Sequence, residues 1–131
     1  MKSLVARAIG LGLAAVLGWS VLLAQEGQET PFDKGVAAYE AGKLDEARQH
    51  FEQALQASPN DYVILTWAGT VALEQQDYDA AISYLQKALK AKPDYHVAHN
   101  NLANAYAAKG DQKNAEEHYQ AALKAKPDYF E

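Results

Sequence analysis

Beyond about residue 30, apolar residues recur at spacings that favour helices with one buried face. Ala47 and Ala54 lie seven residues apart, about two helical turns, so both fall on the same side of a helix. The large side chain of Phe51 stands between them. The same arrangement recurs as Ala81, Leu85 and Ala88, and again as Ala115, Tyr119 and Ala122. The pattern therefore predicts three similar amphipathic helices.

One constant step along the chain relates these helices, and the same step relates Pro59, Pro93 and Pro127. A period of about 34 residues indicates one supersecondary unit stacked on copies of itself. Proline cannot continue a helix, so each of the three prolines follows the second helix of a unit. We predict an all-α fold of three helical hairpins, with helices over residues 31–41, 45–57, 62–75, 79–91, 96–109 and 113–125.

Small residues also recur on the first helix of each hairpin, where Gly35, Gly69 and Ala103 occupy equivalent positions. Small residues mark where helices come close, because a larger side chain there overpacks the contact. The residues expected to pack the repeats are Gly35, Ala47, Phe51, Ala54, Pro59, Gly69, Ala81, Leu85, Ala88, Pro93, Ala103, Ala115, Tyr119, Ala122 and Pro127.

This recurring set resembles the tetratricopeptide repeat (TPR) family, whose unit is a helix–turn–helix of about 34 residues. The chain departs from the family where Pro31, Leu65 and His99 replace a usual aromatic residue. The resemblance implies a TPR-type α-solenoid of three repeats, about residues 28–61, 62–95 and 96–129, preceded by an apolar N-terminal helix. We expect these repeats to form one domain over residues 31–131, joined by a linker over 25–30.

The segment over residues 1–24 has the layout of a secretory signal peptide. Lys2 and Arg7 precede an uncharged, mostly apolar run over residues 8–24, and Ala24 offers a small residue at the exit. The alternative is an uncleaved membrane anchor, although this run is short against the roughly 20 residues that a spanning helix needs. Both interpretations predict export, to the periplasm or medium if cleaved and tethered through residues 8–24 if not.

Charge and composition exclude several functions. The formal net charge is −5, and all 17 acidic residues lie beyond residue 24, so nucleic acid is not an expected partner. The chain has no cysteine, which excludes disulfides, thiolate metal sites and a cysteine nucleophile.

Candidate chemistry is sparse. Ser58 and Ser83 lack the setting of a nucleophile, and the glycines do not cluster into a phosphate loop. His96 and His99, three residues apart, are the best metal candidates, but a structural zinc site needs four ligands and ordinary histidines are the preferred interpretation. We therefore expect no catalytic residue, no metal and no cofactor, and we predict that the protein is not an enzyme.

The family resemblance implies a concave groove lined by the first helix of each repeat. Carried over to this chain, its partner-binding residues are Phe32, Val36, Tyr39, Val63, Thr66, Thr70, Leu73, Val97, Asn100 and Asn104. Some family members hold a C-terminal carboxylate with Lys and Asn on this surface, but Phe32 and Val36 stand at two of those positions, which argues against such a clamp. Asn100 and Asn104, one turn apart, offer donors and acceptors to a peptide backbone.

We therefore expect a non-enzymatic scaffold that binds a peptide segment of an unidentified protein partner. The alternative is a structural protein that self-associates through the end faces of the stack, because uncovered apolar end faces drive association. We expect a monomer rather than a homo-oligomer.

Overall fold

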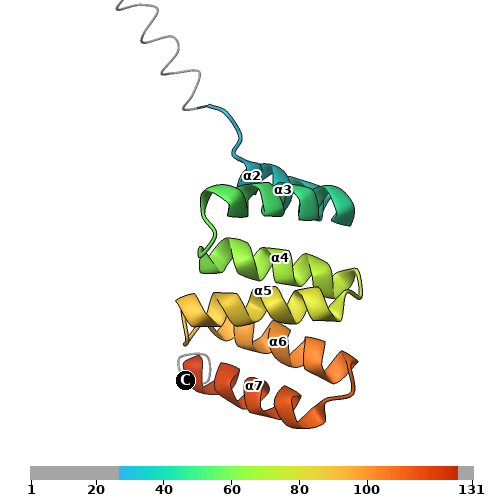
Figure 1. The fold of residues 1–131 in the computed structure, drawn as a ribbon, viewed down its shortest axis with the longest axis vertical. Coiled ribbons are helices and arrows are strands. Elements are labelled where there is room, and N and C mark those ends of the chain that lie inside the picture. Colours follow the sequence, from blue (N-terminus) through green and yellow to red (C-terminus); the bar gives the residue numbers. More distant parts are fainter. Residues whose placement is uncertain (1–26, 127–131) are drawn as a thin grey trace, which may run out of the picture.

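The computed structural model describes residues 27–126, which form six α-helices and no strand. The helices are α2 (Pro31–Glu40), α3 (Leu44–Ala57), α4 (Tyr62–Glu74), α5 (Tyr78–Ala91), α6 (His96–Ala108) and α7 (Gln112–Ala125). They pair as three antiparallel hairpins stacked one upon the next (Figure 1). The expected all-α fold of three helix–turn–helix repeats is thereby confirmed.

The turn inside each hairpin has the same backbone. Gly42, Gln76 and Gly110 have φ values of 75°, 61° and 83°, in the left-handed region. At the first turn, Gly42 N–H donates to the Tyr39 carbonyl and Lys43 N–H donates to that of Ala38, the two bonds of a Schellman motif. This motif ends each first helix one residue earlier than the sequence pattern predicts, and each second helix begins one residue earlier.

The core runs through the stack because its buried clusters cross from one repeat to the next. Phe51 of the first repeat shares a cluster with Ala68 and Val71 of the second. Leu85 of the second repeat shares another cluster with Ala98 and Leu102 of the third. Each hairpin therefore hides its apolar face against a neighbouring hairpin, as repeat proteins require.

Within a hairpin, the two helices meet where the first helix carries its small residue. A methyl group added at Gly69 would lie 2.6 Å from Leu85 Cγ, and one added at Gly35 would lie 2.6 Å from Phe51 Cε1. Both Leu85 and Phe51 are fully buried. Backbone therefore packs directly on side chain at this contact, and neither large residue has room to move away.

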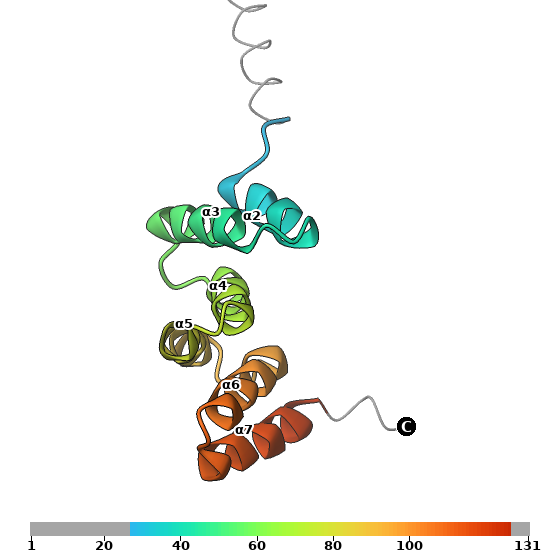
Figure 2. The same cartoon turned by 90° about the vertical axis from the view of Figure 1, so that its right-hand side faces the viewer.

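The first helices lie on one side of the stack. Along the helix axes, α2 and α4 stand beside α3 and α5 respectively (Figure 2). Helix α4 also packs against α6, so the first helices of the second and third repeats contact each other directly. This side of the molecule carries the groove positions that the family resemblance implies.

Most residues expected to pack the repeats are buried, including Gly35, Ala47, Gly69, Ala81 and Ala103. Pro59 and Pro93 are exposed in the loops between repeats, whereas Pro127 lies outside the described residues. In the last helix, Tyr119 is 36% exposed and Leu123 is 62% exposed. These two side chains form part of an apolar end face at α7.

The predicted signal peptide or anchor over residues 1–24 lies outside the described residues. Between residues 27 and 126, none of the helices has the length and apolarity needed to cross a bilayer.

The contact between Gly69 and Leu85 predicts a stability effect. We expect Gly69→Ala to lower the free energy of unfolding by about 1–2 kcal/mol, because overpacking outweighs the ~1 kcal/mol that alanine gains in helix propensity. Urea unfolding measures this loss. Adding Leu85→Ala should relieve part of it, so the double variant should cost less than the sum of the two single changes. Strictly additive effects would contradict the close contact.

Gln76, the left-handed residue of the second turn, predicts a substitution that stabilises the fold. Gln76→Gly should raise the free energy of unfolding by about 0.5–1 kcal/mol, because the strain of a left-handed L-residue exceeds the entropy cost of glycine. In the matched controls Gly42→Ala and Gly110→Ala, no atom lies within 4 Å of the added methyl, so backbone strain alone should lower stability. A destabilised Gln76→Gly variant in thermal unfolding would refute the assignment.

Candidate functional site

Four of the predicted groove residues line one recess of about 260 Å³ on the side of the first helices. These are Tyr39 on α2, Thr66 and Thr70 on α4, and Val97 on α6. The lining is completed by Trp67, Tyr95 and Asn101. All three repeats contribute to this aromatic recess, which exists only because the repeats are stacked.

The aromatic side chains of the recess are held by contacts with their neighbours. The rings of Tyr39 and Trp67 meet edge to face with centroids 5.3 Å apart. Trp67 in turn stacks on buried Phe51 at 5.8 Å. On the side of the third repeat, Tyr95 meets Tyr62 edge to face at 4.9 Å. Because both ends of the recess rest on packed rings, its shape is largely preformed.

Polar groups of the recess are engaged with one another. Thr66 Oγ1 donates to the Tyr62 carbonyl at 2.7 Å, and Thr70 Oγ1 donates to the Thr66 carbonyl at 2.8 Å. Asn101 Nδ2 donates to Thr70 Oγ1 at 2.9 Å, which joins α6 to α4. Thr66 is itself buried. The recess therefore presents mainly aromatic and methyl surface.

A carboxylate lies at the rim of the recess. The hydroxyl of Tyr39 donates to Glu74, the last residue of α4. This hydrogen bond, aided by burial and the negative charge of Glu74, raises the pKa of Tyr39. Glu74 is exposed, so its carboxylate also faces solvent.

The other predicted groove residues have different surroundings. Phe32, Val36 and Leu73 are half-buried and pack against the core clusters, and Val63 is half-buried at the start of α4. Asn100 and Val97 line a second recess of about 510 Å³ with Tyr119 and Leu123. The side-chain carbonyl of Asn104 accepts a hydrogen bond from the Tyr119 hydroxyl. The two asparagines therefore have different surroundings, and their expected role in peptide binding stays a prediction.

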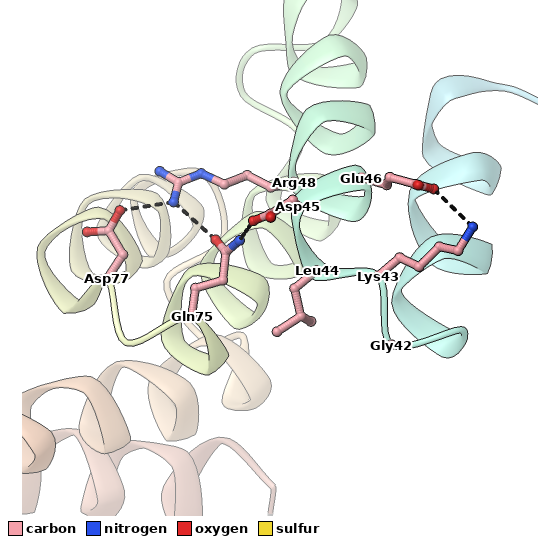
Figure 3. Close-up of a pocket in the computed structure, with 8 residues that line it drawn as sticks. All are labelled: Gly42, Lys43, Leu44, Asp45, Glu46, Arg48, Gln75 and Asp77. Carbon is pink, nitrogen blue, oxygen red and sulfur yellow. Dashed lines mark hydrogen bonds and ion pairs between the residues drawn. The ribbon is translucent and has the colours of Figure 1, made fainter.

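A third recess, of about 730 Å³, is polar and lies between the first and second repeats (Figure 3). Arg48 Nη1 donates to Asp77 at 2.9 Å and to the Gln75 side-chain carbonyl at 3.1 Å. Gln75 Nε2 donates to Asp45 at 2.7 Å. The partners of Arg48 raise its pKa, and Arg48 lowers that of Asp77. We interpret this network as a bridge that sets the position of the second repeat on the first.

The sequence suggested His96 and His99 as a pair, but the structure places His99 beside His118. His99 Nε2 donates to the Pro93 carbonyl at 2.7 Å, so the neutral ring accepts at Nδ1. His118 Nδ1 lies 3.1 Å from that atom, and its ring stacks on Tyr106 at 5.7 Å. His99 therefore pairs with His118 rather than His96. Within residues 27–126, no three His, Asp or Glu side chains converge as a metal site would need.

Sequence reasoning missed Trp67, Tyr95 and Asn101 because it carried over only the positions that the family pattern names. Trp67 and Asn101 occupy equivalent positions in successive repeats, each next to an expected groove residue. An aromatic residue beside a predicted groove position was the available signal.

The three stacked hairpins and the recess on their first helices define an α-helical repeat protein with a recessed surface on one side. Two family models described as tetratricopeptide repeat match residues 32–61 and 68–130. Together these matches span most of the chain, which therefore belongs to the tetratricopeptide repeat family. Comparison with curated protein sequences finds no match.

Solved structures show the same fold. The first TPR of Spaghetti (RPAP3) bound to the HSP90 peptide SRMEEVD has a TM-score of 0.73 at 23% identity, covering 76% of this chain and 79% of that one. The Arabidopsis OM64 TPR domain has a TM-score of 0.73 at 19% identity, and the match covers 76% of this chain and 83% of that domain. A mutant O-GlcNAc transferase of Thermobaculum terrenum has a TM-score of 0.71 at 24% identity, and the match covers 76% of this chain and 19% of the transferase chain. At these identities the likeness is one of fold alone.

The histidine pair predicts a pH dependence of stability. Burial and the neighbouring His99 lower the pKa of His118 below its usual 6.5, although Glu117 opposes this shift. The unfolded chain therefore binds more protons just below pH 6.5, and folding stability should fall as the pH drops through that range.

Urea unfolding from about pH 8 to about pH 5 measures this dependence. We expect the loss at acidic pH to be smaller in His118→Gln, whereas His96→Gln serves as the matched control and should keep it. Equal pH dependence in His118→Gln and the native chain would contradict the assignment.

Proposed function

We propose that this protein is a non-enzymatic scaffold that binds a peptide segment of a partner protein across its first helices. The observation that carries the proposal is the aromatic recess, to which all three repeats contribute. Preformed concave sites with apolar walls and few polar groups are the usual form of ligand sites. The structure of the first TPR of Spaghetti with an HSP90 peptide supports a peptide as the ligand class.

The physical fit favours a side chain inserted from an extended segment. The recess is narrow, at about 260 Å³, and its walls include Tyr39, Trp67 and Tyr95. Aromatic anchors of this kind dominate binding energy at protein interfaces. The second recess, which shares Val97, extends the binding surface toward α7 and gives the segment room for further contacts.

The proposed ligand differs from a C-terminal carboxylate. Phe32 and Val36, at two positions where a clamp would need polar groups, are half-buried and pack against the core. Neither can supply the positive charge or amide that an acidic terminus requires.

We further propose that residues 1–24 direct export, so that the repeats act outside the cytoplasm. The charged start and apolar run of this segment support the proposal. Mass spectrometry of the cell-envelope fraction distinguishes a chain cut after Ala24 from one tethered through residues 8–24. Intact protein in the cytosol would count against export.

Self-association is the second candidate function, and one observation favours it. Leu123 is 62% exposed, whereas Leu55 and Leu89, its equivalents in the earlier repeats, are half-buried against the core. The opposite end is polar, because Asp33 and Lys34 of α2 are exposed. An apolar end meeting a polar end does not favour head-to-tail stacking, so the peptide-binding scaffold remains the leading proposal.

The recess predicts which substitutions weaken binding. A peptide selected from a displayed random library against the full chain should lose about tenfold or more in affinity with Tyr39→Ala or Val97→Ala, because each removes a wall of the recess. Fluorescence anisotropy measures the affinity. Gln53→Ala, an exposed change on α3, serves as the control. Unchanged affinity of both recess variants, with oligomers in light scattering, would favour self-association instead.

A further inference from the structure

The aromatic recess has charged groups of opposite sign at its two ends. Tyr39 is hydrogen bonded to Glu74 at the last turn of α4, which places a carboxylate beside one wall. At the other wall, the Lys92 ammonium lies 5.8 Å from the ring centroid of Tyr95 and 5.0 Å from that of Tyr62. A side chain that enters the recess therefore meets negative charge on the side of α2 and α4.

The ends of these helices lack the basic residues that helix ends favour. Glu40 is the last residue of α2 and Glu74 is the last residue of α4, and neither helix has a basic residue in its last turn. Helix C-termini carry partial negative charge and are stabilised by cations. Helices α3 and α6 also have no basic residue in their last turn, whereas α5 and α7 have Lys90 and Lys124 there. Among the six described helices, only α2 and α4 end on an acidic residue.

These helix ends lie on one edge of the molecule. The first helices run in the same direction, and their C-terminal ends are on the right in Figure 1. On the third repeat, Lys109 follows α6 but is paired with Asp79 of α5. We name Glu40 and Glu74 the acidic edge. An acidic residue at a helix C-terminus is locally unfavourable, and departures from such local rules are expected at functional or strained sites.

We infer that the aromatic recess and the acidic edge together bind a lysine or arginine side chain of the partner segment. Its methylene stem lies along the rings of Tyr39 and Trp67, and its cation reaches Glu74 and Glu40. Long basic side chains bury an apolar stem while their charge stays near water, and cations are attracted to aromatic faces. The inference rests on the proposed function and adds the charge of the ligand, which is opposite to that of the acidic peptide SRMEEVD.

Three fluorescein-labelled heptapeptides test the inference against the full chain. They share the sequence Gly-Leu-X-Leu-X-Leu-Gly, with X as arginine, citrulline or glutamate. Citrulline has the shape of arginine without its charge. In fluorescence anisotropy, the arginine peptide should bind about tenfold more tightly than the citrulline peptide, and the glutamate peptide should bind most weakly. Raising NaCl from about 0.05 M to about 0.5 M should reduce the difference.

Paired variants separate the acidic edge from the overall charge of the protein. Glu40→Gln with Glu74→Gln should bring the ratio of arginine to citrulline affinity close to one. Glutamine retains an acceptor for the Tyr39 hydroxyl, so the recess stays intact. The control, Glu116→Gln with Glu117→Gln on α7, removes the same charge from exposed positions and should leave the ratio unchanged.

The possible failures are distinguishable. Equal affinity for the arginine and citrulline peptides, or equal effects of the two double variants, would overturn the inference. If the heptapeptides do not bind but a library peptide binds in a manner sensitive to Tyr39→Ala, the inference is wrong and the proposed function stands. If neither kind of peptide binds, both are wrong.

Discussion

The close contact between the two helices of each hairpin is the constraint on which the rest of the structure depends. A backbone position without a side chain at Gly35 and Gly69 lets the rings and branches of Phe51 and Leu85 pack directly against the first helix. This contact sets how far apart the helices lie. Since the first two hairpins share this contact, each offers a similar surface to the next hairpin of the stack.

The third repeat meets the same constraint with different residues. Ala103 replaces the glycine, and the larger Tyr119 replaces the buried Leu85 or Phe51. Tyr119 remains partly exposed and donates a hydrogen bond to Asn104 at the surface. Because the Tyr119 ring lies closer to the surface, the third hairpin has room for the methyl group of Ala103. The stacked rings of Tyr106 and His118 join α6 and α7 in this repeat.

Contacts between repeats convert this regular stack into a specific surface. The shared clusters around Phe51 and Leu85 hold neighbouring repeats together, while Arg48 joins α3 to Asp77 and Gln75 beyond α4. The recess forms where Tyr39 of the first repeat approaches Trp67 and Tyr95 of the second, and α6 of the third repeat adds Val97 and Asn101. Its shape follows from the stacking, and its charge follows from which residues end the first helices.

The amino-acid pattern alone determined the helices, the turns and the small residues at their contacts, because these depend on the helical period and on the repeat period within a single chain. It also placed Tyr39, Thr66, Thr70 and Val97 on the groove side through the family resemblance. Only the tertiary structure joined Tyr39 to Glu74, in the following repeat, and His99 to His118. Such pairs depend on side-chain rotamers and on the angle between stacked helices. Packing decides both, and a periodic sequence does not encode either one locally.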